Sequence, residues 1–449
     1  MLCGQCKNVN KVQQQKDKII IMNAFELGLS LLNNQHDDKA QIQFEHVVIQ
    51  DASHALAWFY LGVLALKKGY LQDALDCFRT VLSLNPNDVE AWVNSGVVLL
   101  QQHEPQMAIH EFSKALSIDP NHEAARNNLA ATFVYFDRFE NALVHYNELL
   151  KSNPNHMEYA YNAAVCEMAL GHLDAAITLY EKILRQNPKH FATLNNMAAI
   201  HNRLDQHQKT KDFLERALAV QPDNETCSFM LNALTHQDNK PASCTTYVRH
   251  LFNDYAIHYE QHMNHALGYT LSHHIASVLH QMPLFNVPKA LDLGCGTGLT
   301  GIVLRELCQY LIGIDVSSKM LTKAQEKDIY DELFEAEAVA WLKQNAQHYD
   351  LVVAADVLPY VGDLAPLMEI LSQRIQPKGY FICTFEISEC EDWSIQETAR
   401  FCHHPEYVVS LAKQFGFNLK SEQKVAGRQH QGQDLHVVLC VFERSQEAC

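Results

Sequence analysis

The stretch that decides the fold of the C-terminal half is Leu291-Asp292-Leu293-Gly294-Cys295-Gly296-Thr297-Gly298-Leu299-Thr300-Gly301. It is typical of an apolar strand, a glycine-rich turn and the start of a helix. A second apolar run over 310–314 ends at Asp315, 21 residues after Gly294. A carboxylate there can accept both hydroxyl protons of a ribose, so the stretch predicts a site for a nucleotide-like ligand.

Apolar segments of strand length alternate with helical segments through the rest of this half. The expected strands are Ala290–Leu293, Leu311–Asp315, Leu333–Glu337, Leu351–Ala354, Tyr380–Phe385, Phe417–Val425 and Leu435–Phe442. The helices between them are expected up to 309 and over 317–326, 339–347 and 364–375. This order predicts an α/β Rossmann-like domain over 286–449, with a mostly parallel seven-stranded sheet closed by an antiparallel pair.

The glycine positions separate two kinds of ligand site. A dinucleotide fingerprint needs a third glycine where this chain has Leu299. The observed order, acidic-x-Gly-x-Gly-x-Gly, resembles the class I S-adenosylmethionine-dependent methyltransferases. The segment 349–358 is similar to their fourth motif, and 376–379 is similar to their Pro-Gly-Gly turn, with Lys378 replacing one glycine. The resemblance implies S-adenosylmethionine as cofactor.

The same resemblance implies which residues contact the cofactor. They follow the first four strands or lie in the segment before the first strand. The cofactor-binding set is Tyr255, Tyr259, Asp292, Gly294, Cys295, Gly296, Thr297, Gly298, Asp315, Val316, Met320, Glu337, Ala338, Ala355 and Asp356. For the two tyrosines, the alternative is that they are core residues at helical spacing.

Methyl transfer from a sulfonium depends on positioning and on at most one base. Candidates after the strands are Asp356, Tyr360, Glu386, Arg400, His403 and Tyr407. His403 has a pKa range suited to accepting a proton, although a histidine among 25 can equally be a surface residue. Arg400 is expected to hold a substrate carboxylate or to form a surface ion pair. The segment 356–360 lacks an Asn/Asp-Pro-Pro-Tyr motif, which favours an oxygen, carboxyl or carbon acceptor over an amide.

The N-terminal half repeats every 34 residues. Prolines at one repeat position are Pro86, Pro120, Pro154, Pro188 and Pro222. Small residues at a second position are Ala40, Ala74, Ala108, Ala142, Ala176 and Thr210. Large residues four positions later are Phe44, Phe78, Phe112, Tyr146, Tyr180 and Leu214. Positions four apart share a helix face, so the small and large residues are expected to form one packed seam.

With Trp58-x-x-Leu61-Gly62 and Trp92-x-x-Ser95-Gly96, this pattern resembles the tetratricopeptide repeat. Six repeats are expected over 21–54, 55–88, 89–122, 123–156, 157–190 and 191–224. The remaining expected parts are an N-terminal extension (1–20), a capping helix and linker (225–240), and helices covering the cofactor site (241–285). The domain boundary is therefore placed near 240, at Lys240-Pro241.

Stacked helix pairs form a solenoid whose concave face usually binds a peptide or protein. Polar residues on the first helices are Asn94, Asn127, Asn128, Asn162, Asn195 and Asn196. They are expected to hydrogen-bond an extended backbone, the alternative being an ordinary solvated helix surface.

Composition limits the other partners. The chain has 35 basic and 52 acidic residues and a formal net charge of −17, which makes nucleic acid a poor candidate. No run of 18 apolar residues and no signal-peptide core occur, so we expect a cytoplasmic protein without a membrane partner. Cys3 and Cys6 form one isolated CxxC, which is either half a metal or redox site or two plain thiols; we expect no metal. The oligomeric state is left open.

Taken together, the chain resembles bacterial methyltransferases fused behind tetratricopeptide arrays. The first hypothesis is a methyltransferase whose repeats recruit a small-molecule, carrier-bound or protein acceptor. The second is a scaffold in which the repeats act and the cofactor-binding domain is not catalytic.

Overall fold

The computed structural model describes residues 19–235, 240–256, 259–261, 263, 268–282, 286–389, 391–430 and 433–446. The chain divides into two compact units, Met1–Gln186 and Asn187–Cys449. Cys3, Cys6 and most of the expected N-terminal extension lie outside the described residues, as do residues 236–239 of the expected linker. The last predicted repeat (191–224) and the capping helix belong to the second unit, together with the mixed sheet.

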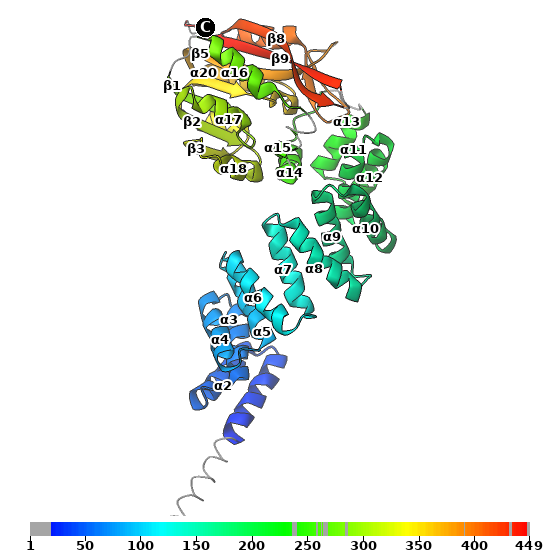
Figure 1. Ribbon diagram of the computed structural model, residues 1–449, viewed down its shortest axis with the longest axis vertical. Helices are drawn as coiled ribbons and strands as arrows, with labels where there is room; N and C mark the ends of the chain where they lie inside the picture. The colour runs from blue at the N-terminus through cyan, green and yellow to red at the C-terminus, as the bar shows by residue number, and fades with distance from the viewer. Residues whose placement is uncertain are drawn as a thin grey trace, which may run out of the picture. The chain divides into compact units, whose positions relative to one another are not determined.

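Helices of nearly uniform length follow the predicted repeat period (Figure 1). In the first unit they are residues 19–33, α2 (Asp37–Gln50), α3 (Ala55–Lys67), α4 (Leu71–Leu84), α5 (Val89–Gln101), α6 (Pro105–Ile118), α7 (Glu123–Tyr135), α8 (Phe139–Ser152), α9 (Met157–Ala169) and α10 (Leu173–Gln186). The second unit begins with α11 (Phe191–Arg203), α12 (His207–Val220) and α13 (Glu225–Thr235). Among the described helices, none is both long and apolar enough to cross a membrane.

The predicted seam of small and large residues is present. Ala108 and Phe112 on α6 are fully buried. Phe112 fills the space above Gly96 of α5 so closely that a Cβ at Gly96 would lie 2.5 Å from the phenyl ring. In this repeat the two helices therefore approach through a glycine on one and a ring on the other.

The first helices of the second to sixth repeats each begin with a side-chain cap that was not expected from the sequence. His54, His122, His156 and His190 each accept a hydrogen bond from the amide three residues later, and Asp88 does the same at α5. These caps satisfy one of the free amides at the start of each helix. A predicted proline lies two residues before each of these caps except His54, where the corresponding residue is Ala52.

The C-terminal sheet is mostly parallel, as predicted, but it has nine strands where seven were expected. Its strands are β1 (Val287–Leu293), β2 (Cys308–Asp315), β3 (Glu332–Glu335), β4 (Tyr349–Ala354), β5 (Ile375–Ile387), β6 (Trp393–Ile395), β7 (Phe401–His403), β8 (Phe417–His430) and β9 (Gln433–Arg444). The path β3-β2-β1-β4-β5 is parallel, and β9 joins β5 and β8 in antiparallel pairs. The two unpredicted strands, β6 and β7, have three residues each, too few to show a periodicity.

The β6–β7 hairpin lies beyond the carboxyl end of β4. Glu386 of β5 pairs with Val437 of β9 and also with Cys402 of β7. A strand has only two edges, so β7 lies on the edge of β5 that β4 occupies. Because β4 ends at Ala354, opposite Cys383, the hairpin continues the sheet past that end. This is the edge at which parallel sheets bind ligands.

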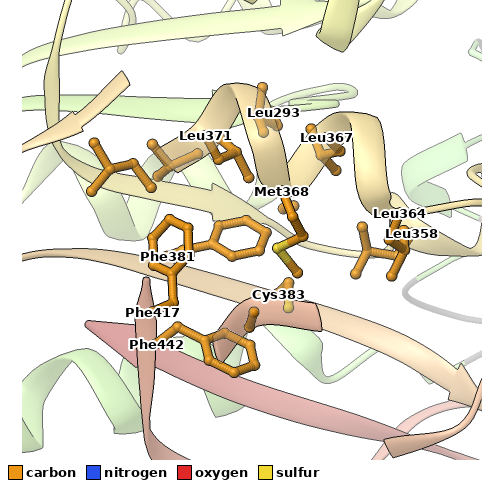
Figure 2. Close-up of a cluster of buried hydrophobic side chains, with 14 of the residues drawn as sticks. Leu293, Leu358, Leu364, Leu367, Met368, Leu371, Phe381, Cys383, Phe417 and Phe442 are labelled. Carbon is orange, nitrogen blue, oxygen red and sulfur yellow. The ribbon is translucent and has the colours of Figure 1, made fainter. Parts of the chain in front are cut away.

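Separate apolar cores cover the two faces of the sheet. On one face, α19 (Ala338–Gln344), α20 (Ala365–Arg374) and α21 (Pro405–Gln414) pack on the strands. Figure 2 shows Leu367, Met368 and Leu371 of α20 directed toward Phe381 and Cys383 of β5. On the other face, α16 (Leu271–Gln281) and α17 (Leu299–Arg305) cover β1, β2 and β9, while α18 (Ser318–Gln325) follows β2.

The segment before β1 forms separate helices in its described part. The described part contains α14 (Thr245–Tyr255), α15 (Tyr259–Gln261) and α16. Between α15 and α16, the Thr270 amide and hydroxyl donate to the backbone carbonyls of Gly427 and Ala426 on β8, at 3.2 and 2.7 Å. These bonds draw the backbone out of the helix and fix the start of α16 against the sheet.

Gly96→Ala tests the packed seam. At an exposed helix position this substitution stabilises by about 1 kcal/mol. Here the Phe112 ring has to move, so we expect the unfolding free energy of the first unit to fall by about 1–3 kcal/mol. The measurement is denaturant unfolding of the full chain, with Ser113→Ala on the exposed side of α6 as control. An unchanged or raised stability in Gly96→Ala would contradict this packing.

Candidate active site

The loops that follow β1 and β4 meet where the strand order reverses. β1 lies between β2 and β4, and the chain runs outward from this pair in both directions. Gly294, directly after β1, has a φ of +63°, and a Cβ on it would lie 2.5 Å from Cγ2 of Val357. A larger residue at Gly294 would therefore be strained and would push the two loops apart.

The loop after β1 is fastened to the end of β2 by Asp315. The Gly296 amide donates to Oδ2 of Asp315 at 2.9 Å, and the Ser317 amide donates to Oδ1 at 2.8 Å. Burial raises the pKa of the Asp315 carboxyl to about 6, and these amides offset part of that rise. Each carboxylate oxygen keeps a further lone pair for a ligand.

Asp292, near the end of β1, is buried beneath the glycine-rich loop. Its side chain is 1% exposed and accepts a hydrogen bond from the Tyr330 hydroxyl at 2.7 Å. Tyr330 also packs against Gly301, where a Cβ would lie 2.1 Å from the phenol oxygen. Burial raises the pKa of Asp292 to about 7. Tyr330 was not identified from the sequence, because a lone tyrosine in a connection carries no pattern.

A cavity of about 150 Å³ lies at this edge of the sheet. Ten predicted cofactor residues line it: Tyr259, Gly294, Gly296, Asp315, Val316, Met320, Glu337, Ala338, Ala355 and Asp356. Five predicted residues are not among its lining: Tyr255, Asp292, Cys295, Thr297 and Gly298. Cys295 and Thr297 are buried within the loop.

Further lining residues were missed from the sequence. Most come from the segment before β1 and from the turns after the strands: Ser243, Thr245, Val248, Phe252, Ile314, Ala336, Val357 and Val361. Thr245, Val248 and Phe252 lie on one face of α14, at spacings of three and four. That stripe was visible in the sequence, but core packing explains such a stripe equally well.

Glu337 was expected to close the third strand. In the structure β3 ends at Glu335, and Glu337 instead caps α19. Its two oxygens accept from the amides of Val339 and Ala340, at 2.9 and 2.7 Å. Glu337 still lines the cavity, so its carboxylate both starts the helix and borders the site.

A buried arginine organises the other end of the cavity. Arg400 is 6% exposed, and its Nη2 donates to Oδ1 of Asp356 at 2.6 Å. Its Nε donates to Oε1 of Glu386 at 2.7 Å, and its Nη1 donates to the Tyr360 hydroxyl. The guanidinium also lies 4.8 Å from the centre of the Tyr360 ring. Arg400 is thus held by internal partners on all three nitrogens, which matches neither alternative expected from the sequence, an open substrate clamp or a surface ion pair.

His403 and Tyr407 are not among the residues that line the cavity. Nε2 of His403 lies 2.9 Å from the Gly362 carbonyl, the ring is fully buried, and burial lowers the His403 pKa to about 4. The Tyr407 hydroxyl lies 3.1 Å from Oδ1 of Asp363 and accepts from the Leu364 amide. Both residues therefore stabilise the surrounding loops, and the predicted base role of His403 is not supported.

Aromatic rings close the cavity on the side of α14 and α15. The Tyr255 and Tyr259 rings lie 5.2 Å apart, and the Phe252 and Tyr360 rings lie 5.1 Å apart. Burial raises the pKa of Tyr259 well above its ordinary value and that of Tyr255 to about 12, so both phenols are neutral. Tyr259 lines the cavity, while Tyr255 packs behind it.

Family models match both parts of the chain. A model described as a methyltransferase domain matches residues 291–381. Models described as the tetratricopeptide repeat match residues 55–88, 89–122 and 127–191. The chain carries a methyltransferase domain behind tetratricopeptide repeats.

Curated relatives of the methyltransferase domain share only part of their length with this chain. Trans-aconitate 2-methyltransferase of Paracidovorax citrulli is 32% identical over 104 residues, covering 23% of this chain and 40% of the relative. Mitochondrial ubiquinone biosynthesis O-methyltransferase of Rattus norvegicus is 29% identical over 103 residues, covering 21% and 30%. Among solved structures, YrrB, a repeat protein with an unusual peptide-binding site, aligns with a TM-score of 0.39 and 20% identity over 41% of this chain and 95% of YrrB.

Asp292→Asn tests the buried carboxyl beneath the loop. An unfolded aspartate has a pKa of about 3.9, so between that pH and about 7 the folded chain binds more protons than the unfolded chain. The stability contributed by Asp292 is therefore lost as pH rises through this window. Asparagine can still accept the Tyr330 bond and carries no charge, so we expect the variant to melt higher than the parent at pH 8 and to show a shallower decline above pH 4.

Asp331→Asn is the control of opposite sign. Burial acts to raise the Asp331 pKa, but the Leu311 amide and Arg305 outweigh it, and the pKa is lowered. Stability from Asp331 is present at neutral pH and is lost as pH falls. We therefore expect Asp331→Asn to melt lower than the parent at pH 8. Melting curves from pH 4 to pH 8 decide, and an Asp292→Asn profile identical to the parent's would refute the account.

Proposed function

We propose that the second unit transfers a methyl group from S-adenosylmethionine to an acceptor brought by the repeat array. The observation that carries this proposal is the Asp315 carboxylate, buried at the end of β2, lining the cavity and bonded to the Gly296 amide. A carboxylate in this position suits two ribose hydroxyls. The methyltransferase relatives support the same chemistry.

The charge of the cavity fits a cationic cofactor. The charged side chains among its described lining residues are Asp315, Glu337 and Asp356, all carboxylates. Arg400 balances the charge of Asp356, so Asp315 and Glu337 are the carboxylates that favour a cation. A Cβ on Gly296 would meet nothing within 4 Å, so the backbone there leaves room for a ligand. Asp315 would hold the ribose, Met320 and Ala338 would pack against the base, and Gly294 and Gly296 would admit the amino-acid part.

When bound, the cofactor supplies a methyl group on a sulfonium. The chain's own residues then position the acceptor and exclude water. Asp356 lines the cavity, and Arg400 holds one of its carboxylate oxygens. We assign to Asp356 the role of the base, which accepts the proton that an acceptor hydroxyl, carboxyl or activated carbon loses on methylation. Its φ of +56°, unusual for a residue with a side chain, is a strain that its functional position would explain.

The repeats would supply the acceptor or its carrier. Tetratricopeptide arrays bind extended peptides, and the cytoplasmic location expected from composition suits a protein partner. The predicted asparagines differ in availability. Asn94 Nδ2 donates to the Glu90 carbonyl of its own helix, and Asn195 accepts from Cys227. Oδ1 of Asn127 has no hydrogen-bond partner but is buried, so a peptide could reach it only if neighbouring side chains move.

Cofactor binding tests the site assignment. We expect calorimetry on the full chain to show S-adenosylmethionine binding that Gly296→Arg abolishes. Asp315→Ala should weaken binding about 10- to 100-fold, because it removes charged hydrogen-bond acceptors for the ligand. Glu326→Ala, at an exposed carboxylate after α18, is the control and should bind as the parent does. Unchanged dissociation constants in both site variants would refute the assignment.

Acceptor chemistry requires a second test. Cell extract incubated with the protein and methyl-labelled cofactor should yield labelled product, identified by mass spectrometry. We expect Asp356→Asn to lower the rate of labelling at least about 100-fold while cofactor binding is kept. Asp363→Asn, at an exposed carboxylate outside the cavity lining, should label normally. Cofactor binding without any labelling by the parent protein would favour the scaffold hypothesis.

A further inference from the structure

The helix that ends the repeat array packs against the elements around the cavity. Phe229 of α13 is 8% exposed. Its ring centre lies 5.2 Å from that of Tyr247 on α14 and 6.1 Å from that of Phe401 on β7. One side chain from the capping helix thus contacts two separate elements of the methyltransferase part of the second unit.

The first of these elements forms a wall of the cavity. Tyr247 is 6% exposed and lies on the same helix as Thr245, Val248 and Phe252, which line the cavity. Ser243, just before α14, also lines it, and its Oγ accepts a hydrogen bond from the Gly362 amide at 3.0 Å. A shift of Tyr247 would move this wall.

The second element, the β6–β7 hairpin, packs on the same glycine. A Cβ on Gly362 would lie 2.7 Å from the Trp393 ring of β6 and 3.0 Å from the Phe401 ring. Nε2 of His403, on β7, lies 2.9 Å from the Gly362 carbonyl. Gly362 therefore connects the loop after β4 to the start of α14 and to the hairpin. Phe229 contacts both of these elements, through Tyr247 and Phe401.

The second strand of the hairpin, β7, begins next to the buried arginine. Arg400 directly precedes Phe401 and donates to Asp356 and Tyr360, which both line the cavity. The position of β7 thus sets the position of the guanidinium, and through it the side chains at the acceptor end of the cavity.

We propose that α13, which the repeat pattern assigns to the end of the array, is a structural part of the methyl-transfer site. Phe229 is a positioning residue that holds α14 and β7 at the cavity. This inference rests on the proposed function. It extends that function by assigning the outer support of the acceptor end to the repeat array and not to the methyltransferase domain.

A second contact between these parts is weaker. His207 of α12 lies 3.7 Å from Glu397 in the turn of the β6–β7 hairpin, and both side chains are about half exposed. Exposed ion pairs contribute little. Phe229 is therefore the residue that we change to test this contact.

The test compares variants of the full chain by calorimetry with S-adenosylhomocysteine as probe. We expect Phe229→Ala to weaken binding about tenfold, because α14 loses its outer support and the cavity wall loosens. Phe229→Tyr, which keeps the ring, should restore binding. Met230→Ala removes an equally buried side chain (8% exposed) from the next position of the same helix and should bind as the parent does. If Phe229→Ala does not fold, Phe229→Leu provides the same comparison with a smaller loss.

Each outcome decides between the accounts. Weakened binding in Phe229→Ala with parental binding in Met230→Ala supports the positioning role. Parental binding in a folded Phe229→Ala overturns it, and so does equal weakening in both alanine variants, which would indicate a general loss of stability. If the parent protein itself does not bind the probe, the proposed function fails, and that result is distinct from failure of this inference.

Discussion

The bond between the Gly296 amide and the Asp315 carboxylate joins the two features on which the site depends. It fixes the loop after β1 to the end of β2, while Gly294 brings the same loop against Val357 after β4. Three strand ends are thereby held around one cavity. This arrangement buries two carboxyl groups. Burial raises the pKa of Asp315 to about 6 and that of Asp292 to about 7. A cationic ligand placed beside Asp315 would favour its ionised form, so ligand binding and ionisation support each other.

The end of the cavity around Asp356, where we place the methyl acceptor, is held by a buried network of ion pairs. Arg400 is buried together with Asp356 and Glu386, and Arg428 also donates to Glu386 at 3.2 Å. Two arginines and two carboxylates balance in charge, so no lone charge is buried. The network fixes Asp356 in an unusual backbone conformation at the cavity. The hairpin that carries Arg400 continues the sheet beyond β4, and Phe229 of the capping helix packs on it. Cavity, hairpin and array end form one continuous packing arrangement within the second unit.

Sequence reasoning succeeded where a local pattern has a single physical cause. The period of 34 residues, the packed seam of residues such as Ala108 and Phe112, and the alternation of strands and helices after the glycine loop each predicted what the structure contains. It failed where the cause is tertiary. His403 has the chemistry of a base, but only the fold shows that its ring is bonded to Gly362 and buried. Arg400 has the chemistry of an anion clamp, but its partners come from two other segments, the loop after β4 and the end of β5. Strands of three residues and a lone Tyr330 leave no periodic signal to detect.

The most direct test of the central claim is a crystal structure of the full chain grown with saturating S-adenosylhomocysteine. The account predicts the ligand in the cavity at the carboxyl ends of β1, β2 and β4, with both ribose hydroxyls donating to Asp315 and its amino-acid part beside Gly294 and Gly296. An unoccupied cavity, or a ligand bound elsewhere with Asp315 untouched, would contradict it.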